Sequence, residues 1–396
     1  MDKHNAVASH WCAKFDEDGL QKWAHGLRAQ LAAPQVTLGL VFMAPQLQAH
    51  AQAILEILRL HAQVPLLVGC TSESLIALDK EYENLNGLVL GLYYLPGAQL
   101  QACRVTGDQV EEANGPGYWH LETEVKPEQC NGWLVFADPF HLDMERMILG
   151  WNEAYPGLPI IGGLASGMEN ETRTWVFLNG EVYDSGAVAV SFGGAVQIKS
   201  VISQGCTPIG ETWIITKAER NLILEIGKRR AYEILLEMFH RMSPEEQQKT
   251  RGNVLVGLAI NEYLEDFHRG DFLVRNLLGA DPRSGIIAVG ATPRQGQTVQ
   301  FQRRDAEAAT EDMSELLKRT QQKLGGQTIY GGCLCCCNGR GSRLFGAQHH
   351  DAALVNQVLG QMGLTGFFCN GEIGPVGERN FLHGYTASLA LFVPKP

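Results

Sequence analysis

The sequence predicts a two-domain α/β protein in which repeated strand-helix-strand units form mixed sheets flanked by helices. The chain has 396 residues, and globular domains commonly hold about 100–200 residues, so two domains are expected. Hydrophobic residues make up 45% of the chain and charged residues 19%, which is enough apolar mass for two cores. Strand and helix patterns also alternate along the chain and recur as a three-copy repeat, which is typical of α/β architecture.

A helical lead-in is expected over residues 1–35. Its apolar residues recur at helical spacing, at Phe15, Leu20, Trp23, Leu27 and Leu31. Pro34 then marks the start of the first domain.

The first copy of the repeat begins with a buried strand at residues 37–42. An amphipathic helix follows at 49–61, and a second strand at 64–68. That strand runs into the turn Gly-Cys-Thr-Ser-Glu at 69–73, and a third strand is expected at 87–95.

The second copy has the same order. A strand at residues 132–136 is followed by a helix at 142–151 and a short strand at 158–161. A glycine turn at 162–167 comes next. Strands at 174–178 and 186–192 then read as a hairpin joined by Asn179-Gly180, a strong turn signal.

The third copy closes the chain. It comprises a strand at residues 329–337, a helix at 352–362 and a strand at 364–368. A turn at 369–374 and a last strand at 385–392 complete it. The three copies predict related structural units.

Further elements lie between the second and third copies. They are helices at 230–242 and 305–324 and strands at 254–260 and 285–290. A cluster of glycine and proline at 205–210 marks the domain boundary, which gives domains at 36–215 and 216–396.

Charge and composition narrow the partners and the compartment. The net charge is −11, and the short basic clusters at 228–230 and 303–304 are flanked by acids, so nucleic-acid binding is not expected. The start of the sequence has no apolar signal region, and apolar runs such as 87–95 are half the length of a membrane-spanning helix. Ten cysteines in this context indicate thiols in the cytoplasm.

The segment 331–341, GGCLCCCNGRG, is the strongest local feature. A buried strand of small residues ends in a glycine turn, where backbone N–H groups can approach a ligand. Arg340 offers a planar fork for a carboxylate or phosphate, and its charge would favour a thiolate at Cys337, which borders the turn.

The cysteines of this strand also raise the question of a metal. Strand alternation places Cys333, Cys335 and Cys337 on one face and Cys336 on the other. This spacing differs from that of a zinc knuckle, although His349-His350 lies nearby. Small buried apolar residues are the favoured interpretation.

Two polar motifs follow in the third copy. Glu372, in the turn Asn370-Gly371-Glu372, could accept from a ligand amine or act as a general acid or base if its pKa were raised; a turn carboxylate that bonds backbone N–H groups is the alternative. His383, beside Thr386, could ligate a haem iron or a metal, or be a hydrogen-bonded structural histidine.

The N-terminal half contains related glycine turns. Gly69, Cys70 and Thr71 sit at a point of the first repeat that corresponds to residues 162–166 of the second. Both turns could bind an anion through backbone donors or serve only as tight turns. Phosphate-loop, zinc-protease and nucleophile-elbow motifs are absent, so an enzyme is the less favoured class.

Several segments together resemble the FIST family. They are Gly69-Cys70-Thr71-Ser72, GCTPIGETWII at 205–215, LILEIGKRRAYEILL at 222–236, CNGRG at 337–341, GFFCNGEIG at 366–374, and Tyr385-Thr386. The resemblance runs from about residue 36 to the end of the chain, as a FIST N-terminal and a FIST C-terminal domain of the bacterial stand-alone type.

The resemblance implies a sensory, small-ligand-binding module of intracellular signal transduction, with amino acids or their derivatives as ligands. It implies a shared pocket at Cys337, Arg340, Asn370, Glu372 and Thr386. Because the chain carries no F-box, kinase, cyclase or methyl-accepting segment, its output would need a separate signalling partner.

The favoured interpretation is a cytoplasmic sensor without a resident cofactor. Arg340 and the amides of the glycine turns, Gly69, Cys70 and Thr71 included, would hold the anionic group of a ligand, and Glu372 would bind its amine. A haem-based nitric-oxide sensor with His383, His349 or His350 as ligands is one alternative. Others are an enzyme with Cys337 as nucleophile and His383 or Glu372 as base, and a scaffold that binds proteins through its sheet edges.

Overall fold

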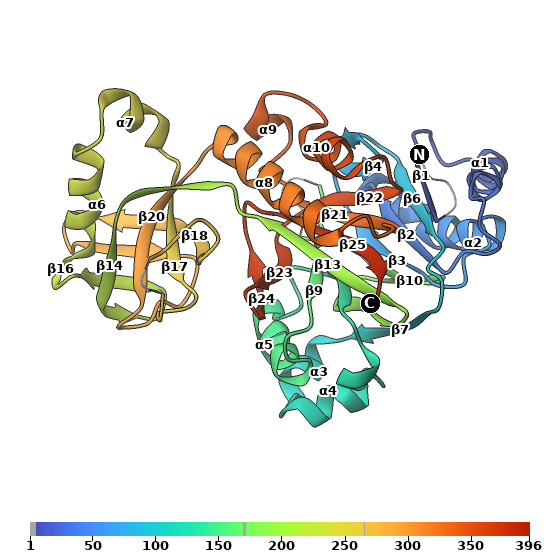
Figure 1. Ribbon diagram of the computed structural model, residues 1–396, viewed down its shortest axis with the longest axis horizontal. Coiled ribbons are helices and arrows are strands. Elements are labelled where there is room, and N and C mark those ends of the chain that lie inside the picture. The colour runs from blue at the N-terminus through green and yellow to red at the C-terminus, as the bar shows by residue number, and fades with distance from the viewer. Residues whose placement is uncertain (1–4, 169–171, 265) are drawn as a thin grey trace. The chain divides into compact units, whose positions relative to one another are not determined.

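The computed structural model describes residues 5–168, 172–264 and 266–396 and divides into two compact units. Unit 1 joins the chain up to Ile202 with Met313–Pro396, and unit 2 is Ser203–Asp312 (Figure 1). The described strands form mixed sheets flanked by helices, so the predicted α/β class is confirmed. No helix in the described residues is long and apolar enough to cross a membrane.

The first sheet of unit 1 is built from the first repeat. Its strand order is β1 (Ala6–Trp11), β6 (Leu88–Tyr93), β2 (Leu38–Met43), β3 (Leu67–Thr71), β10 (Val176–Leu178) and β11 (Glu181–Tyr183). Strands β2 and β3 are parallel and are joined through η1 (Pro45–His50) and α2 (Ala51–His61). Helices α1 (Glu17–Gln30) and α2 bury their apolar faces in one core cluster with this sheet. Because Ala6–Trp11 pairs with β6, the expected helical lead-in contains an edge strand as well as a helix.

The second sheet repeats this arrangement. Its order is β7 (Ala98–Val105), β12 (Ala187–Gly194), β8 (Trp133–Ala137), β9 (Ile160–Leu164), β23 (Glu372–Val376) and β24 (Arg379–His383). Helix α5 (Met144–Ala154) connects the parallel strands β8 and β9. The short helices α3 (Gly107–Glu112), α4 (Pro116–Glu122) and η2 (Pro127–Gln129) follow β7 in the chain. Strand β12 lies here, so the Asn179-Gly180 turn joins β10 to β11 and not to β12 as expected.

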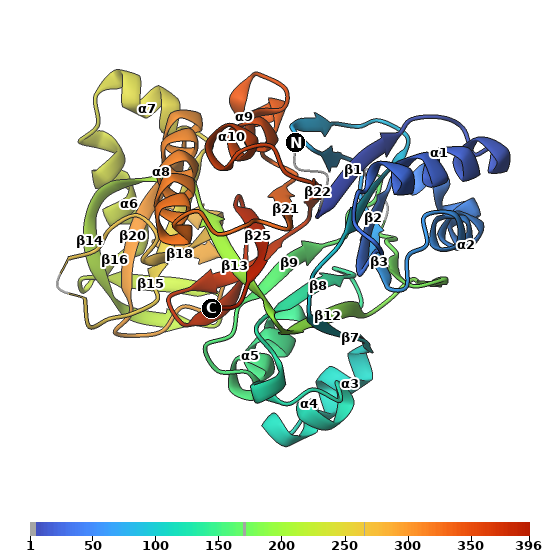
Figure 2. The same ribbon diagram turned by 45° about the vertical axis from the view of Figure 1, so that its right-hand side comes forward.

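The third sheet has the order β13 (Val196–Ser203), β25 (Ala387–Pro394), β21 (Gly331–Cys337), β22 (Leu364–Cys369), β4 (Leu75–Ala77) and β5 (Lys80–Tyr82). The parallel strands β21 and β22 are connected through α9 (Ser342–Phe345) and α10 (His350–Leu359). The second half of α8 (Ala306–Leu324) contributes Met313 and Leu317 to the core on this sheet. In Figure 2 the strands of the three sheets lie next to one another in the interior of unit 1.

The three repeats exchange hairpins in a cycle. The hairpin β4–β5 of the first repeat extends the third sheet, and β10–β11 of the second repeat extends the first sheet. The hairpin β23–β24 of the third repeat extends the second sheet. Each repeat therefore depends on another repeat to complete its sheet, which interlocks unit 1.

The same glycine position recurs in the parallel pair of every repeat. A Cβ at Gly69, Gly162 or Gly366 would lie 1.6, 1.8 or 1.9 Å from a carbonyl oxygen of the neighbouring strand. Such a contact admits only a residue without a side chain. The close approach fixes the register of the strand that leads into each glycine turn.

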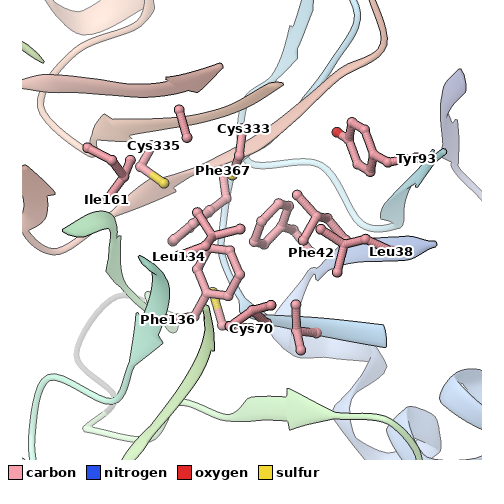
Figure 3. Close-up of a cluster of buried hydrophobic side chains, with 14 of the residues drawn as sticks. Leu38, Phe42, Cys70, Tyr93, Leu134, Phe136, Ile161, Cys333, Cys335 and Phe367 are labelled. Atoms are coloured by element: carbon pink, nitrogen blue, oxygen red, sulfur yellow. The ribbon is translucent and has the colours of Figure 1, made fainter. Parts of the chain in front are cut away.

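An apolar core lies where the sheets meet (Figure 3). Phe42 of the first repeat stacks on Phe367 of the third at 4.5 Å between ring centroids, and Phe136 of the second repeat packs edge-on against Phe42 at 5.1 Å. The buried thiols of Cys333 and Cys335 belong to the same core and serve as small apolar residues, as the sequence suggested. The thiol of Cys70, which was expected at a ligand site, lies in this core as well.

Unit 2 has an antiparallel sheet of its own, inserted between β13 and β21 of the third repeat. Its strand order is β14 (Cys206–Glu219), β20 (Thr298–Arg304), β17 (Val254–Ala259), β18 (Phe272–Asp281), β19 (Ile286–Val289), β15 (Leu222–Ile226) and β16 (Arg229–Arg230). An additional pairing of β14 with β15 closes the sheet into a ring. Helix α6 (Ala231–His240) buries Ile234, Leu235 and Met238 against it, and α7 (Pro244–Thr250) follows.

Candidate functional site

The glycine turns of the three repeats meet at one point. The hydroxyl oxygens of Ser72 and Ser166 lie 2.7 and 2.8 Å from the carbonyl oxygen of Phe368, at the end of β22. They lie 3.2 Å from each other, and both serines are buried. The segments 69–73, 162–166 and 369–374, which the sequence placed at equivalent points, thus converge in space. The expected turns are shorter than predicted, because residues 69–71 belong to β3, residues 162–164 to β9 and Glu372 to β23.

Backbone hydrogen bonds fasten the second and third turns together. The N–H of Leu164 donates to the carbonyl of Gly371 at 2.8 Å, and the N–H of Asn370 donates to the carbonyl of Leu164 at 3.1 Å. The side-chain amide of Asn370 adds a bond to the carbonyl of Ala165 at 3.3 Å. We call the place where residues 69–73, 162–166 and 369–374 converge the three-turn site.

Glu372 is the buried carboxyl of the three-turn site. Its Oε2 accepts from the backbone N–H of Thr386 at 2.9 Å, its Oε1 accepts from the thiol of Cys369 at 3.3 Å, and it is also hydrogen-bonded to Cys337. Burial raises the pKa of Glu372 to about 8, and these hydrogen bonds, with the charge of Arg340, oppose the rise only in part. At pH 7 most of the population is therefore a neutral carboxylic acid that can both donate and accept.

Cys337 ends strand β21 beside this carboxyl and is half-buried. The backbone N–H of Gly339 points at its sulfur, with an N–S distance of 3.5 Å. The N–H of Cys337 donates to the carbonyl of Thr386 at 3.0 Å, so Cys337 and Thr386 flank Glu372 from neighbouring strands.

The side chain of Arg340 is buried and forms an ion pair with Asp351. Its Nε and Nη2 donate to the two carboxylate oxygens of Asp351 at 2.7 and 2.9 Å, and neither side chain is exposed. Burial alone would raise the pKa of Asp351, but the charge and bonds of Arg340 outweigh burial and hold that pKa well below its usual range. The remaining nitrogen, Nη1, is buried without a hydrogen-bond partner in the described residues. The fork expected to receive a ligand's anionic group is thus filled by Asp351, and the ligand role of Arg340 remains a prediction that concerns Nη1 alone.

A second buried carboxyl lies on the far side of this ion pair. Glu81 of β5 accepts from the N–H of Ala352 at 3.0 Å through Oε1, while its Oε2 is buried without a partner in the described part of the chain. Burial, and secondarily the charge of Asp351, raises the pKa of Glu81 to about 7. Glu372 and Glu81 are therefore two buried carboxyls whose charge changes near neutral pH.

The three histidines considered as haem ligands contact different partners. His383 is buried, with Nε2 2.9 Å from the carbonyl oxygen of Gly374. The Nδ1 of His349 accepts from the N–H of Glu81 at 2.9 Å, and His350 stacks on Phe345. Across residues 5–168, 172–264 and 266–396, no three His, Cys, Asp or Glu side chains group as a metal site.

The N-terminal candidates support the three-turn site through the backbone. The Cys70 side chain faces the apolar core, and the Thr71 hydroxyl accepts from the N–H of Trp175 at 3.0 Å. Gly69 is required by its contact with Val41. All three residues belong to β3, and the N–H groups of Thr71 and Ser72 donate to the carbonyls of Trp175 and Met43 at 2.9 Å, so the expected anion-binding amides are used within the fold.

The outer edge of the site is narrow. Asn338 donates through its side-chain amide to that of the exposed Asn370 at 2.8 Å. Beside it lies a pocket of about 20 Å³, lined by Glu73, Ser74, Glu83, Asn84, Asn338, Arg343 and Phe368. That volume is enough for a water molecule but too small for an amino acid in this conformation.

Several residues of the site were not identified from the sequence. They are Ser72, Glu81, Ser166, Asp351 and Cys369. Alignment of the repeats could have identified the two serines, and strand alternation could have paired Cys369 with Cys337. Asp351 and Glu81 had no local signal, because their partners are distant in the chain or across a loop.

Comparison with known proteins identifies the family. The model of the FIST N domain matches residues 37–229, and the model of the FIST C domain matches residues 231–375. An uncharacterized protein of Mycobacterium tuberculosis (strain ATCC 25618 / H37Rv) is 38% identical over 327 residues, which is 83% of each chain. An uncharacterized protein of Mycobacterium bovis (strain ATCC BAA-935 / AF2122/97) is 35% identical over 349 residues, which is 87% of this chain and 88% of the relative.

Among solved structures, a crystal structure of cyanuric acid hydrolase from A. caulinodans aligns over 99% of this chain and 100% of that one, with a TM-score of 0.38 and 10% identity. FIST domains are associated with signal transduction and small-ligand sensing. Since the two domain models together match nearly all of residues 37–375, the chain belongs to the FIST family.

Proposed function

We propose that this protein is a small-ligand-binding sensor of cytoplasmic signal transduction, and that its ligand binds at the three-turn site. The observation that supports this most is Glu372, a fully buried carboxyl with a raised pKa at the start of β23. A buried ionisable group costs stability, and groups of this kind gather at functional sites. Cys337, Asn370 and Thr386 surround it and complete the proposed contacts.

The ligand we propose is an amino acid or a related small zwitterion. Its ammonium group would pair with Glu372 in the ionised form, which accepts hydrogen bonds at both oxygens. Its carboxylate would meet Arg340 Nη1, which is buried and lacks a partner in the described residues. Because the pocket holds only about 20 Å³, binding must first separate Asn338 from Asn370.

The output would follow from the convergence of the turns. The third turn is bonded to the second repeat through Leu164 and to the first through Ser72. A ligand that opens the third turn therefore shifts strand ends in all three sheets, and the changed surface would be read by a separate signalling partner. Such an output needs no catalytic step.

Isothermal titration calorimetry tests this proposal directly. At pH 7 a pKa of about 8 leaves about 0.9 of Glu372 protonated, so an ammonium ligand should release about 0.9 proton per molecule bound. Titrations of amino acids in two buffers of different ionisation enthalpy measure that release. Glu372→Gln should abolish it and weaken binding by about 10- to 100-fold, as expected for a lost charge-assisted bond.

Glu378→Gln is the matched control, because Glu378 is exposed on the turn between β23 and β24. It should bind as wild type does. The proposal fails if no amino acid or small amine raises the melting temperature at millimolar concentration. It also fails if a ligand binds equally well to the Glu372→Gln variant.

A further inference from the structure

Two thiols of the three-turn site face each other across neighbouring strands. Cys337 of β21 and Cys369 of β22 are direct partners in the parallel register. Directly paired residues project from the same face of a sheet, and neighbouring strands lie about 4.8 Å apart. That spacing falls within the Cα separation of about 4.4–6.8 Å that a disulfide requires.

Both thiols are in contact with the same carboxyl. The Cys369 sulfur lies 3.3 Å from Glu372 Oε1 and 3.1 Å from the carbonyl oxygen of Cys336, so its one proton is shared between two acceptors, and Cys337 is hydrogen-bonded to Glu372 as well. Burial raises the pKa of Cys369 most, and the charges of Glu372 and then Cys337 raise it further. The two sulfur atoms and the carboxyl therefore form one compact group.

Cys337 has the surroundings of the attacking thiol. It is half-buried, whereas Cys369 is fully buried. The N–H of Gly339 points at its sulfur, and the charge of Arg340 interacts with it. A backbone donor and a nearby cation both favour the thiolate, which is the reactive form of cysteine.

We infer that Cys337 and Cys369 form a peroxide-oxidised dithiol site, in which Cys337 is attacked first and Cys369 resolves it as a disulfide. The other thiols of the strand are placed differently. Cys333 and Cys335 share the apolar core with Cys369. In this strand, which the structure describes in full, only Cys337 is hydrogen-bonded to Glu372 beside Cys369. Cys336 faces the opposite side of the sheet, toward Asp351. The inference concerns residues of the proposed ligand site but does not require a ligand.

The chemistry balances with a hydroperoxide as the oxidant. The Cys337 thiolate attacks one peroxide oxygen, the O–O bond breaks, and the leaving alkoxide or hydroxide takes up a proton, which leaves Cys337 as the sulfenic acid. The Cys369 sulfur then attacks the Cys337 sulfur, the S–O bond breaks, and the departing hydroxide leaves as water after it takes the thiol proton. Two thiols and one hydroperoxide thus yield a disulfide, one alcohol or water, and one water.

Glu372 is positioned to transfer the proton of the second step. It accepts from the Cys369 thiol and contacts Cys337, where the hydroxide leaves. Steric access also separates the oxidants. Cys337 is only partly exposed and Cys369 is fully buried, so hydrogen peroxide reaches the pair more readily than the much larger glutathione disulfide.

The test uses the full reduced chain without ligand. After brief treatment with a few equivalents of hydrogen peroxide, remaining thiols are blocked with N-ethylmaleimide and the protein is digested with trypsin. Cleavage after Lys323, Arg340, Arg343 and Arg379 places Cys337 in peptide 324–340 and Cys369 in peptide 344–379. The expected product is a disulfide between these peptides, which fragmentation assigns to Cys337 among the four cysteines of the first peptide.

Variants and a second oxidant sharpen the outcome. Cys337→Ser should lose more than 90% of the linked product. In Cys369→Ser, Cys337 should be trapped by dimedone as a sulfenic acid and should proceed to the sulfinic acid. Cys103→Ser, which removes another half-buried thiol in a different sheet, should link as wild type does. Glutathione disulfide should give at least about tenfold less product at the same concentration.

The inference is wrong if the wild-type link joins Cys369 to another cysteine, or if Cys337 reaches the sulfinic acid without any link. It is also wrong if glutathione disulfide works as well as peroxide. The wild-type result alone decides the matter should a variant fail to fold. Because ligand binding is measured separately on the reduced protein, either proposal can fail while the other stands.

Discussion

Replacement of Glu372 by Gln should change how the stability of unit 1 depends on pH. The pKa of Glu372 rises from an ordinary 4.5 to about 8 in the folded protein, because the carboxyl is buried. Between these two values the unfolded chain has released the proton and the folded chain still holds it. Stability therefore falls as pH rises from about 4.5 to about 8, in the direction that linkage requires for a carboxyl whose folded pKa is raised.

The magnitude follows from the same two values. At 1.36 kcal/mol per pH unit, a pKa that moves from 4.5 to about 8 corresponds to a loss of about 4–5 kcal/mol between pH 4.5 and pH 8.5. Gln stays neutral throughout and keeps a carbonyl for the N–H of Thr386, but it forfeits the bond from Cys369, at a cost of about 1 kcal/mol. The variant should be about 1 kcal/mol less stable than wild type at about pH 4 and below and about 3–4 kcal/mol more stable at pH 8.5, so the two curves cross near about pH 5.

Urea unfolding at several pH values, followed by tryptophan fluorescence, measures this crossing. The signal reports mainly on unit 1, because Trp213 belongs to unit 2 and the other six of the seven tryptophans belong to unit 1. Glu81, whose pKa rises to about 7, lowers stability over part of the same range in both proteins, so only the difference between them is diagnostic. Parallel curves for wild type and Glu372→Gln would refute the reasoning.

Two further substitutions test the support of the site by thermal or urea unfolding. Asp351→Ala should lower the free energy of unfolding by about 3–5 kcal/mol, because it leaves the buried guanidinium of Arg340 without its partner. The double variant Asp351→Ala with Arg340→Met should recover most of that loss. A loss under about 1 kcal/mol for the single variant would contradict a buried ion pair. Gly69→Ala should prevent the folding of unit 1, because its Cβ would lie 1.6 Å from the carbonyl oxygen of Val41. The control Gly26→Ala in helix α1 should fold normally, because a Cβ there meets nothing within 4 Å. A soluble Gly69→Ala protein that unfolds cooperatively would contradict the close contact between the strands.

The parts of the fold that local pattern controls could be predicted. Strand-helix-strand units and their glycine turns show in the sequence because alternation, helical periodicity and glycine act over a few residues. The exchange of hairpins among repeats could not be predicted, since a short strand such as β4 carries no information about which distant edge it joins. For the same reason Asn179-Gly180 correctly indicated a turn, while the strand assigned to its far side was wrong.

The residues of the site likewise divide into those that the sequence predicted and those that it did not. Glu372 and Cys337 were identified from the turns beside them, and Thr386 from the family resemblance; the structure places the three in mutual contact. Arg340 was assigned from its guanidinium chemistry, which predicts that it binds a carboxylate but not which one. That carboxylate is Asp351, 11 residues away across a loop and buried by tertiary packing that no local pattern encodes.

The ion pair of Arg340 and Asp351 has a role in the proposed sensor even without a ligand contact. It anchors the turn that begins at Cys337, so the sulfur stays opposite Glu372 and Cys369 while the outer amides of Asn338 and Asn370 remain able to part. With a fixed ion pair below and a separable Asn338–Asn370 contact above, ligand binding could displace one turn without unfolding the core. Since that displaced turn is bonded to Leu164 and Ser72, the strain passes to strand ends in the other two repeats. In the proposed sensor, the interlocked hairpins would let a local event at Glu372 affect all three sheets of unit 1.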